Sequence, residues 1–197
     1  CGIMKVIVKS NADEVVLEWL KAELNSERFS NDLQAAIKKA GQTDTIITSA
    51  DLNDENENKI RQHILRQYRE WLTQDLNLYS WQWSELSQDD VRGLQYIDYS
   101  YWNELSDNTS LVGRAAQNVS KGKVVFDVPN DRFYSVAKAV EAGQPLPPII
   151  LVSNSDKEPA EILEGHLRAT GYALAKKVPY PLCAVIGTSK ILSVGTQ

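Results

Sequence analysis

Residues 161–175, Glu-Ile-Leu-Glu-Gly-His-Leu-Arg-Ala-Thr-Gly-Tyr-Ala-Leu-Ala, predict a short buried strand that ends at Gly165 and continues at once as a helix. The first N–H groups of a helix have no acceptor within it and lie at the positive end of its dipole, so such a turn favours an anion. His166 and Arg168 fall in the first helical turn, and Glu164 ends the strand. We therefore expect Arg168 to hold a phosphate and Glu164 to act as a general base or metal ligand.

A purely structural interpretation of the same residues stands beside this one. Strand–glycine–helix junctions occur wherever a strand packs under a helix, and Arg168 can be a solvated surface charge. A four-residue pattern such as Gly-His-x-Arg also recurs by chance, so its context has to support it.

The flanking sequence supplies that context, because it predicts a regular order of short elements. A helix is expected where apolar residues recur at helical spacing and end at Gly143, and the prolines after it force an extended connection. The expected elements are a helix over 130–143, an extended segment over 144–148, strands over 149–152 and 160–163 joined by a polar turn over 153–159, the helix after Gly165, and a strand over 182–186.

This order resembles the ParB N-terminal and sulfiredoxin superfamily. The residues that carry the resemblance are Ala142-Gly143, Pro147-Pro148-Ile149-Ile150-Leu151-Val152 and Glu164-Gly165-His166-Leu167-Arg168-Ala169, within about 70 residues at the C-terminal end. The superfamily includes CTP-binding partition proteins, ATP-using sulfiredoxins, a free-serine kinase and proposed nucleases. The resemblance implies a nucleotide or phosphate site at the Gly165 turn, with ATP or CTP and Mg²⁺ as candidate cofactors.

We predict Glu164 and His166 as catalytic residues and Gly165, His166, Arg168 and Thr170 as ligand-binding residues, with no protein-only metal site. Two departures from the superfamily's motifs disfavour two of its activities, the reduction of sulfinic acids by sulfiredoxins and the DNA clamping of partition proteins. Sulfiredoxins have a nucleophilic Cys between the Gly and the His, whereas Gly165 is followed directly by His166. Partition proteins have a paired Arg in this turn and continue into a DNA-binding helix-turn-helix, whereas this sequence ends at Gln197, soon after its last predicted strand.

Composition limits the other function classes. A net charge of −5 gives no general attraction for polyanions, so nucleic-acid binding is disfavoured. No apolar run of membrane-spanning length and no secretory leader is visible, so we expect a soluble, cytoplasmic protein without membrane contact. The two cysteines form no disulfide framework, and Cys183 is expected to be a small buried residue.

The first half of the sequence is expected to be predominantly helical. A strand is expected over 4–8, and helices over 13–24, from Ser30 or Asn31 to Gly41, and over 59–72. In the helix over 59–72, Arg61, Arg66 and Arg69 lie outside the apolar stripe. This basic face can bind an anion, but the acidic segment 51–58 before it offers an internal partner.

We therefore expect an α+β protein, with a mostly helical N-terminal region over 1–120 packed on a small mixed-sheet ParB/sulfiredoxin-like domain over 121–197. The two parts can also form one compact unit. The aromatic residues of the middle third, among them Trp71, Trp81, Trp83 and Trp102, are expected to pack as the joint between the two.

The leading functional hypothesis is binding of a nucleotide or other phosphorylated small molecule at the Gly165 turn, with phosphoryl transfer or phosphodiester hydrolysis. The alternatives are a non-catalytic interaction module that contacts a protein partner through the aromatic segment, and a DNA-directed nuclease or regulator.

Overall fold

The computed structural model describes residues 5–72, 75–154 and 159–189, as backbone only for residues 5–7, and divides into two compact units. One unit is helical and comprises residues 10–79, and the other contains the sheet and comprises residues 1–9 and 80–197. The protein is of the α+β class, and its N-terminal region is mostly helical, as expected from the sequence.

The expected division near residue 120 does not coincide with the boundaries of these units. Residues 80–120 contribute two strands and several helices to the sheet unit. The chain passes between the units within two strands, β1 (Lys5–Ser10) and β2 (Tyr79–Leu86). Residue 120 is instead the last residue of a helix, which is followed by Lys121 as its C-cap and by Gly122 at a φ of +85°.

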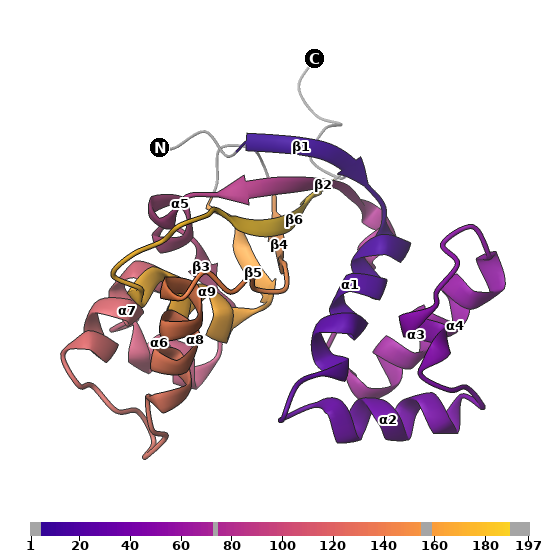
Figure 1. The fold of residues 1–197 in the computed structure, drawn as a ribbon, viewed down its shortest axis with the longest axis horizontal. Coiled ribbons are helices and arrows are strands. Elements are labelled where there is room, and N and C mark those ends of the chain that lie inside the picture. Colours follow the sequence, from indigo (N-terminus) through magenta and orange to yellow (C-terminus); the bar gives the residue numbers. More distant parts are fainter. Residues whose placement is uncertain (1–4, 73–74, 155–158, 190–197) are drawn as a thin grey trace. The chain divides into compact units, whose positions relative to one another are not determined.

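The helical unit is built from α1 (Ala12–Leu24), α2 (Ser30–Lys39), α3 (Thr45–Thr48), α4 (Glu55–Tyr68) and a short 3₁₀ helix (Leu76–Leu78) (Figure 1). Helix α4 packs against α1 and α2, and the core between them is formed by fully buried side chains such as Trp19, Leu20, Leu33 and Ile64. The acidic segment 51–58 contains the start of α4, where Asp54 caps the helix and accepts hydrogen bonds from the amides of Asn56 and Glu57.

One expectation for α4 was wrong. The spacing places Arg61 outside the apolar stripe, but its side chain is completely buried. Burial is tolerated because the guanidinium donates to the carbonyls of Ile46 and Asp51 and to the side chains of Asn58 and Glu57.

The sheet unit contains a six-stranded mixed sheet with the strand order β1-β2-β6-β4-β5-β3 (Figure 1). Its remaining strands are β3 (Gln95–Tyr96), β4 (Ile149–Ser153), β5 (Glu161–Glu164) and β6 (Leu182–Ser189). Strand β4 is parallel to β6 and antiparallel to β5, and β5 is parallel to β3. The predicted strands after the prolines are thus confirmed, and two of them, β4 and β6, form the centre of the sheet.

Five helices belong to the described part of this unit: α5 (Gln88–Arg92), α6 (Ser100–Leu105), α7 (Val112–Ser120), α8 (Asp131–Glu141) and α9 (His166–Leu174). Helix α9 packs against α8, α7 and α5, and also contacts β4. Gly171 permits the contact with α8, because a Cβ there would collide with Val136. Helix α9 is therefore held on several sides, and its first turn is fixed relative to the centre of the sheet.

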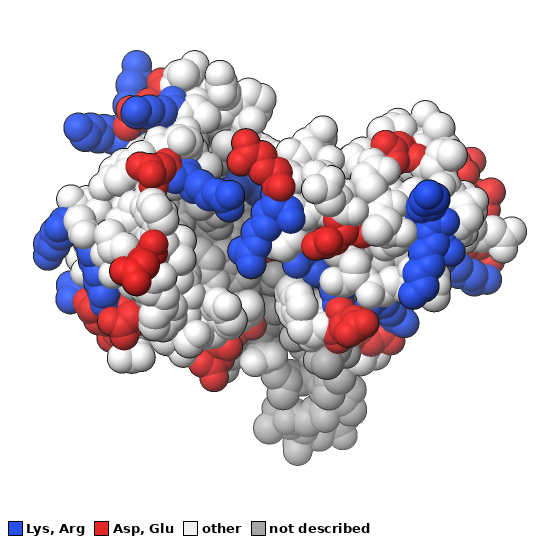
Figure 2. Space-filling view, turned by 90° about the horizontal axis from the view of Figure 1, so that it is seen from below, with Lys and Arg blue, Asp and Glu red and all other residues white. Residues whose placement is uncertain are grey.

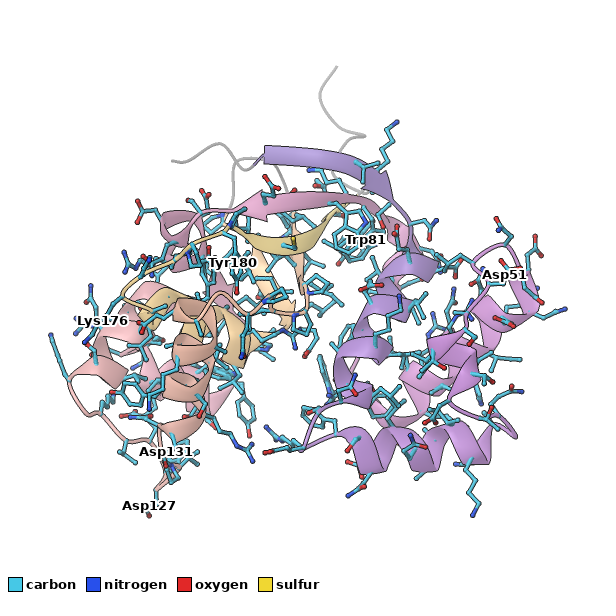
Figure 3. All side chains as sticks on the ribbon, viewed as in Figure 1. Asp51, Trp81, Asp127, Asp131, Lys176 and Tyr180 are labelled. Carbon is cyan, nitrogen blue, oxygen red and sulfur yellow. The ribbon has the colours of Figure 1, made fainter. Side chains whose placement is uncertain are left out.

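The aromatic residues of the middle third are distributed over both units. Trp71 belongs to the helical unit, where its ring lies 6.2 Å from that of Trp19. In the sheet unit, the Trp81 ring of β2 occupies the space that a side chain at position 187 of β6 would need (Figure 3). Trp102 contacts the rings of Tyr96 and Phe133.

Cys183 lies on β6 and is exposed, so the expectation of a buried residue was wrong. The strand alternates at this point, with Leu182 and Ala184 buried on either side. No helix in the described ranges is long and apolar enough to cross a membrane.

Candidate functional site

The turn predicted from sequence is present between β5 and α9. Gly165 has φ +101° and ψ 23°, and its carbonyl accepts the first helical hydrogen bond, from the Ala169 amide at 2.9 Å. A Cβ at Gly165 would lie 3.0 Å from Arg168 Nη2 and closer still to the Ile149 side chain. Both the left-handed backbone and this close packing require glycine.

The two ends of α9 differ in how their backbone groups are satisfied. At the C-terminus, the Gln88 amide donates to the carbonyls of Tyr172 and Ala175 at 3.1 and 2.7 Å, and Arg92 donates to that of Ala173 at 3.3 Å. At the N-terminus, no side chain caps the helix, and none of the hydrogen bonds found in the described residues reaches the amides of residues 166–168. The positive end of the helix therefore offers three unsatisfied donors.

Arg168 lies across the turn. Its Nη2 donates to the Pro148 carbonyl at 3.0 Å and to Glu164 Oε1 at 3.3 Å. The Arg168 and Glu164 side chains are 15% and 16% exposed, and Arg168 Nε is buried without a hydrogen-bond partner. Glu164 was expected to face a phosphate held by Arg168, and the structure instead pairs the two side chains with each other.

His166 is enclosed by aromatic rings. Its imidazole stacks on the Trp102 ring at 5.3 Å between centroids and 12° between planes, and the Tyr96 ring lies at 6.0 Å and 14°. Burial, and to a smaller extent the Arg168 charge, lowers the pKa of His166 to about 4. The ring is therefore neutral near pH 7, and its buried Nε2 has no hydrogen-bond partner among the residues described.

Thr170 is completely buried, so it supports the turn from the interior. Its hydroxyl donates to the His166 carbonyl at 2.7 Å and shares a 2.7 Å hydrogen bond with the Tyr96 hydroxyl. Burial also raises the pKa of Tyr96, so this phenol stays protonated and the connection persists over the ordinary pH range.

The structure thus brings all the predicted residues to one turn and adds four that sequence reasoning missed. These are Pro148 and Ile149, which contact Arg168 and Gly165, and Tyr96 and Trp102, which contact His166. The Pro-Pro segment and the aromatic cluster are both visible in the sequence. Their approach to the Gly165 turn depends on the pairing of β3 with β5 and of β4 with β5, which local patterns do not specify.

Lys and Arg are interspersed with Asp and Glu on the face of the molecule shown in Figure 2. Among the described residues, no group of three or more His, Cys, Asp or Glu side chains is arranged to hold a metal ion. Two of the hollows in the described part of the chain lie in the helical unit and have volumes of about 10 and 450 Å³. Neither is lined by a residue of the Gly165 turn, whereas Arg66 of the expected basic face borders the smaller one.

Comparison with known proteins gives no match to a family model, to a curated protein or to a solved structure. The geometry of the turn is therefore the basis for a functional assignment.

Proposed function

We propose that this protein binds a nucleotide or another phosphorylated ligand at the Gly165 turn, as a ParB/sulfiredoxin-like domain. The observation that carries the proposal is the first turn of α9, where the amides of residues 166–168 have no acceptor among the described residues and the Arg168 guanidinium packs against Gly165. Unsatisfied helix N-terminal amides and an arginine are the groups that proteins commonly use to bind phosphate.

The chain order around the turn supports the same assignment. Helix α8, strands β4 and β5, the Gly165 turn, helix α9 and strand β6 follow one another as the resemblance implies. At the C-terminal end of α9, Gln88 and Arg92 hydrogen-bond to the helix carbonyls and hold the helix in place. This adds to the support, because a ligand that binds at the N-terminal end needs a helix that does not shift.

Phosphoryl transfer or phosphodiester hydrolysis is the chemistry that such a site would perform, with magnesium supplied together with the nucleotide. Glu164 is the carboxylate nearest Arg168, and it becomes available only when its hydrogen bond with Nη2 is broken. His166, being neutral, can accept a proton or form a hydrogen bond through its free nitrogen, but it is a weak base.

The test is a calorimetric titration of the purified protein with ATP, CTP and GTP, with and without magnesium, followed by an assay for hydrolysis. We expect at least one nucleotide to bind, and we expect Arg168→Gln to weaken that binding at least tenfold. Arg132→Gln is the matched control, since it removes an exposed arginine from α8 of the same unit. Absence of binding to the wild-type protein, or equal binding by Arg168→Gln, would contradict the proposal.

A non-catalytic interaction module is the second candidate, and the turn between α7 and α8 favours it. Phe126 is 64% exposed at a φ of +50°, and Val124 and Val128 beside it are also exposed. Asp127 lies at the tip of this turn (Figure 3). A bulky exposed residue in a left-handed conformation is unusual, and such strain is found at contact sites. This function predicts no nucleotide binding in the same titration.

A further inference from the structure

The charges at the Gly165 turn restrict which phosphate it can accept. The sheet unit, residues 1–9 and 80–197, contains thirteen Lys and Arg and thirteen Asp and Glu, so it has no net charge to attract anions. At the turn itself, Arg168 is paired with Glu164 and His166 is neutral. The net charge at the turn is therefore also zero, and an anion has to compete with Glu164 for the Arg168 guanidinium.

That competition depends on the charge of the ligand. A singly charged anion that displaces the Glu164 carboxylate is attracted to Arg168 about as strongly as the carboxylate was. It gains no net attraction, and it also loses its translational and rotational freedom on binding. A doubly charged anion makes about twice that attraction and interacts more strongly with the open end of the α9 dipole. Competition with Glu164 therefore weakens the binding of a monoanion more than the binding of a dianion.

The unused donors at the turn agree with this preference. They are the three amides of residues 166–168. A phosphate monoester has three terminal oxygens and a charge between about −1.5 and −2 near pH 7. A phosphodiester in a nucleic-acid backbone has two free oxygens and one charge.

We infer that Glu164 makes the Gly165 turn selective for doubly charged terminal phosphates, as in a phosphate monoester or at the end of a nucleotide, over phosphodiesters such as a nucleic-acid backbone. The inference rests on the proposed function, since it concerns the same site. Of the two reactions named there, it favours phosphoryl transfer over phosphodiester hydrolysis, because a nuclease must accept a diester.

The experiment compares methyl phosphate with dimethyl phosphate at pH 8, where the first is a dianion and the second a monoanion. Amide NMR shifts of residues 165–168 report binding in the millimolar range. We expect the wild-type protein to bind methyl phosphate at least tenfold more tightly than dimethyl phosphate. In Glu164→Gln, which retains the shape of the side chain, we expect dimethyl phosphate to bind more tightly and the preference to fall at least threefold.

Glu161→Gln is the matched control, because it removes a carboxylate from the same strand at a position that does not contact Arg168. We expect this variant to keep the wild-type preference. A second readout is pH: wild-type affinity for methyl phosphate should fall between pH 8 and pH 5, as the ligand gains a proton, while affinity for dimethyl phosphate changes less.

The outcomes separate the inference from the proposed function. If methyl phosphate and nucleotides bind but Glu164→Gln keeps the full preference for the monoester, the selectivity role of Glu164 is wrong and the phosphate site remains. If the wild-type protein binds the two esters equally, the inference is also wrong. If neither ester nor any nucleotide shifts the amides of residues 165–168, the phosphate site is wrong, and the inference fails with it.

Discussion

The first turns of α4 and α9 differ in how their backbone amides and positive dipole ends are satisfied. In α4, Asp54 accepts hydrogen bonds from two amides, Glu55 and Glu57 supply negative charge, and the buried Arg61 binds Glu57. In α9, no side chain caps the helix, and no acidic residue lies in the first turn. The positive end of α4 is neutralised by the acidic residues of its own cap and first turn. The positive end of α9 has no such residues and stays without a negative partner from its own first turn.

The two arginines differ in the same way. Arg61 is completely buried and donates to two carbonyls and two side chains, so most of its donors are used inside the helical unit. Arg168 is partly exposed and uses only Nη2, whereas Nε has no hydrogen-bond partner in either arginine. A structural arginine is one whose donors are used within the fold. From this comparison we expect Arg61 to contribute mainly to stability, whereas Arg168 is the residue that we propose for binding.

Replacing each arginine by methionine should separate these two roles most clearly. Arg61→Met should lower the free energy of unfolding by about 3–5 kcal/mol, because it leaves buried carbonyls and Asn58 without their donor. Arg168→Met should cost about 1 kcal/mol and abolish phosphate binding. Urea denaturation and the methyl phosphate titration measure the two effects. Equal losses of stability would remove the distinction.

Gly165→Ala tests whether the open turn of α9 depends on close packing. We expect a loss of about 2–4 kcal/mol, because the residue has a positive φ and its Cβ would collide with Ile149. The control is Gly143→Ala, at a φ of +78° with no atom within 4 Å of the added Cβ, which should cost about 1 kcal/mol. Equal losses in urea denaturation would show that the backbone conformation alone determines the cost.

Acid should weaken the sheet unit through His166. Its folded pKa of about 4 lies below the ordinary value near 6.5, so the unfolded chain binds the proton more readily. The stability contributed by the neutral ring is complete above pH 6.5 and is lost as pH falls toward 4. Since a tenfold difference in proton affinity corresponds to about 1.4 kcal/mol, and the ring is incompletely buried, we expect a loss of about 1–2 kcal/mol.

His166→Phe keeps an aromatic ring on Trp102 and has no group to protonate, so its stability between pH 7 and pH 4.5 should fall less than that of the wild type. Denaturation curves at several pH values measure this difference. Identical pH profiles for the two proteins would mean that His166 is not the group responsible.

The sequence predicts the parts of this molecule that local physics determines. Gly165, with helical spacing after it and an apolar run before it, is sufficient to locate the turn, and the proline–strand order locates β4 and β6. The Arg168–Glu164 pair and the His166–Trp102 stack depend on the path of Arg168 across the turn and on strand pairing, which periodicity does not encode. Arg61 was misplaced for a related reason, because its acceptors come partly from residues 46 and 51.

Asp54→Ala should have the smallest effect on stability among these variants. It also tests most directly whether the first turns of α4 and α9 differ in their ability to bind phosphate. Removing this cap frees two amides at the start of α4 and should cost about 1 kcal/mol. If free helix amides were enough to bind phosphate, the variant would gain a second site for methyl phosphate. We expect no gain, because Glu55 and Glu57 still repel an anion and Arg61 is buried out of reach. Shifts in the amides of residues 55–58 during the titration would show that an open helix end needs no exposed arginine to bind phosphate.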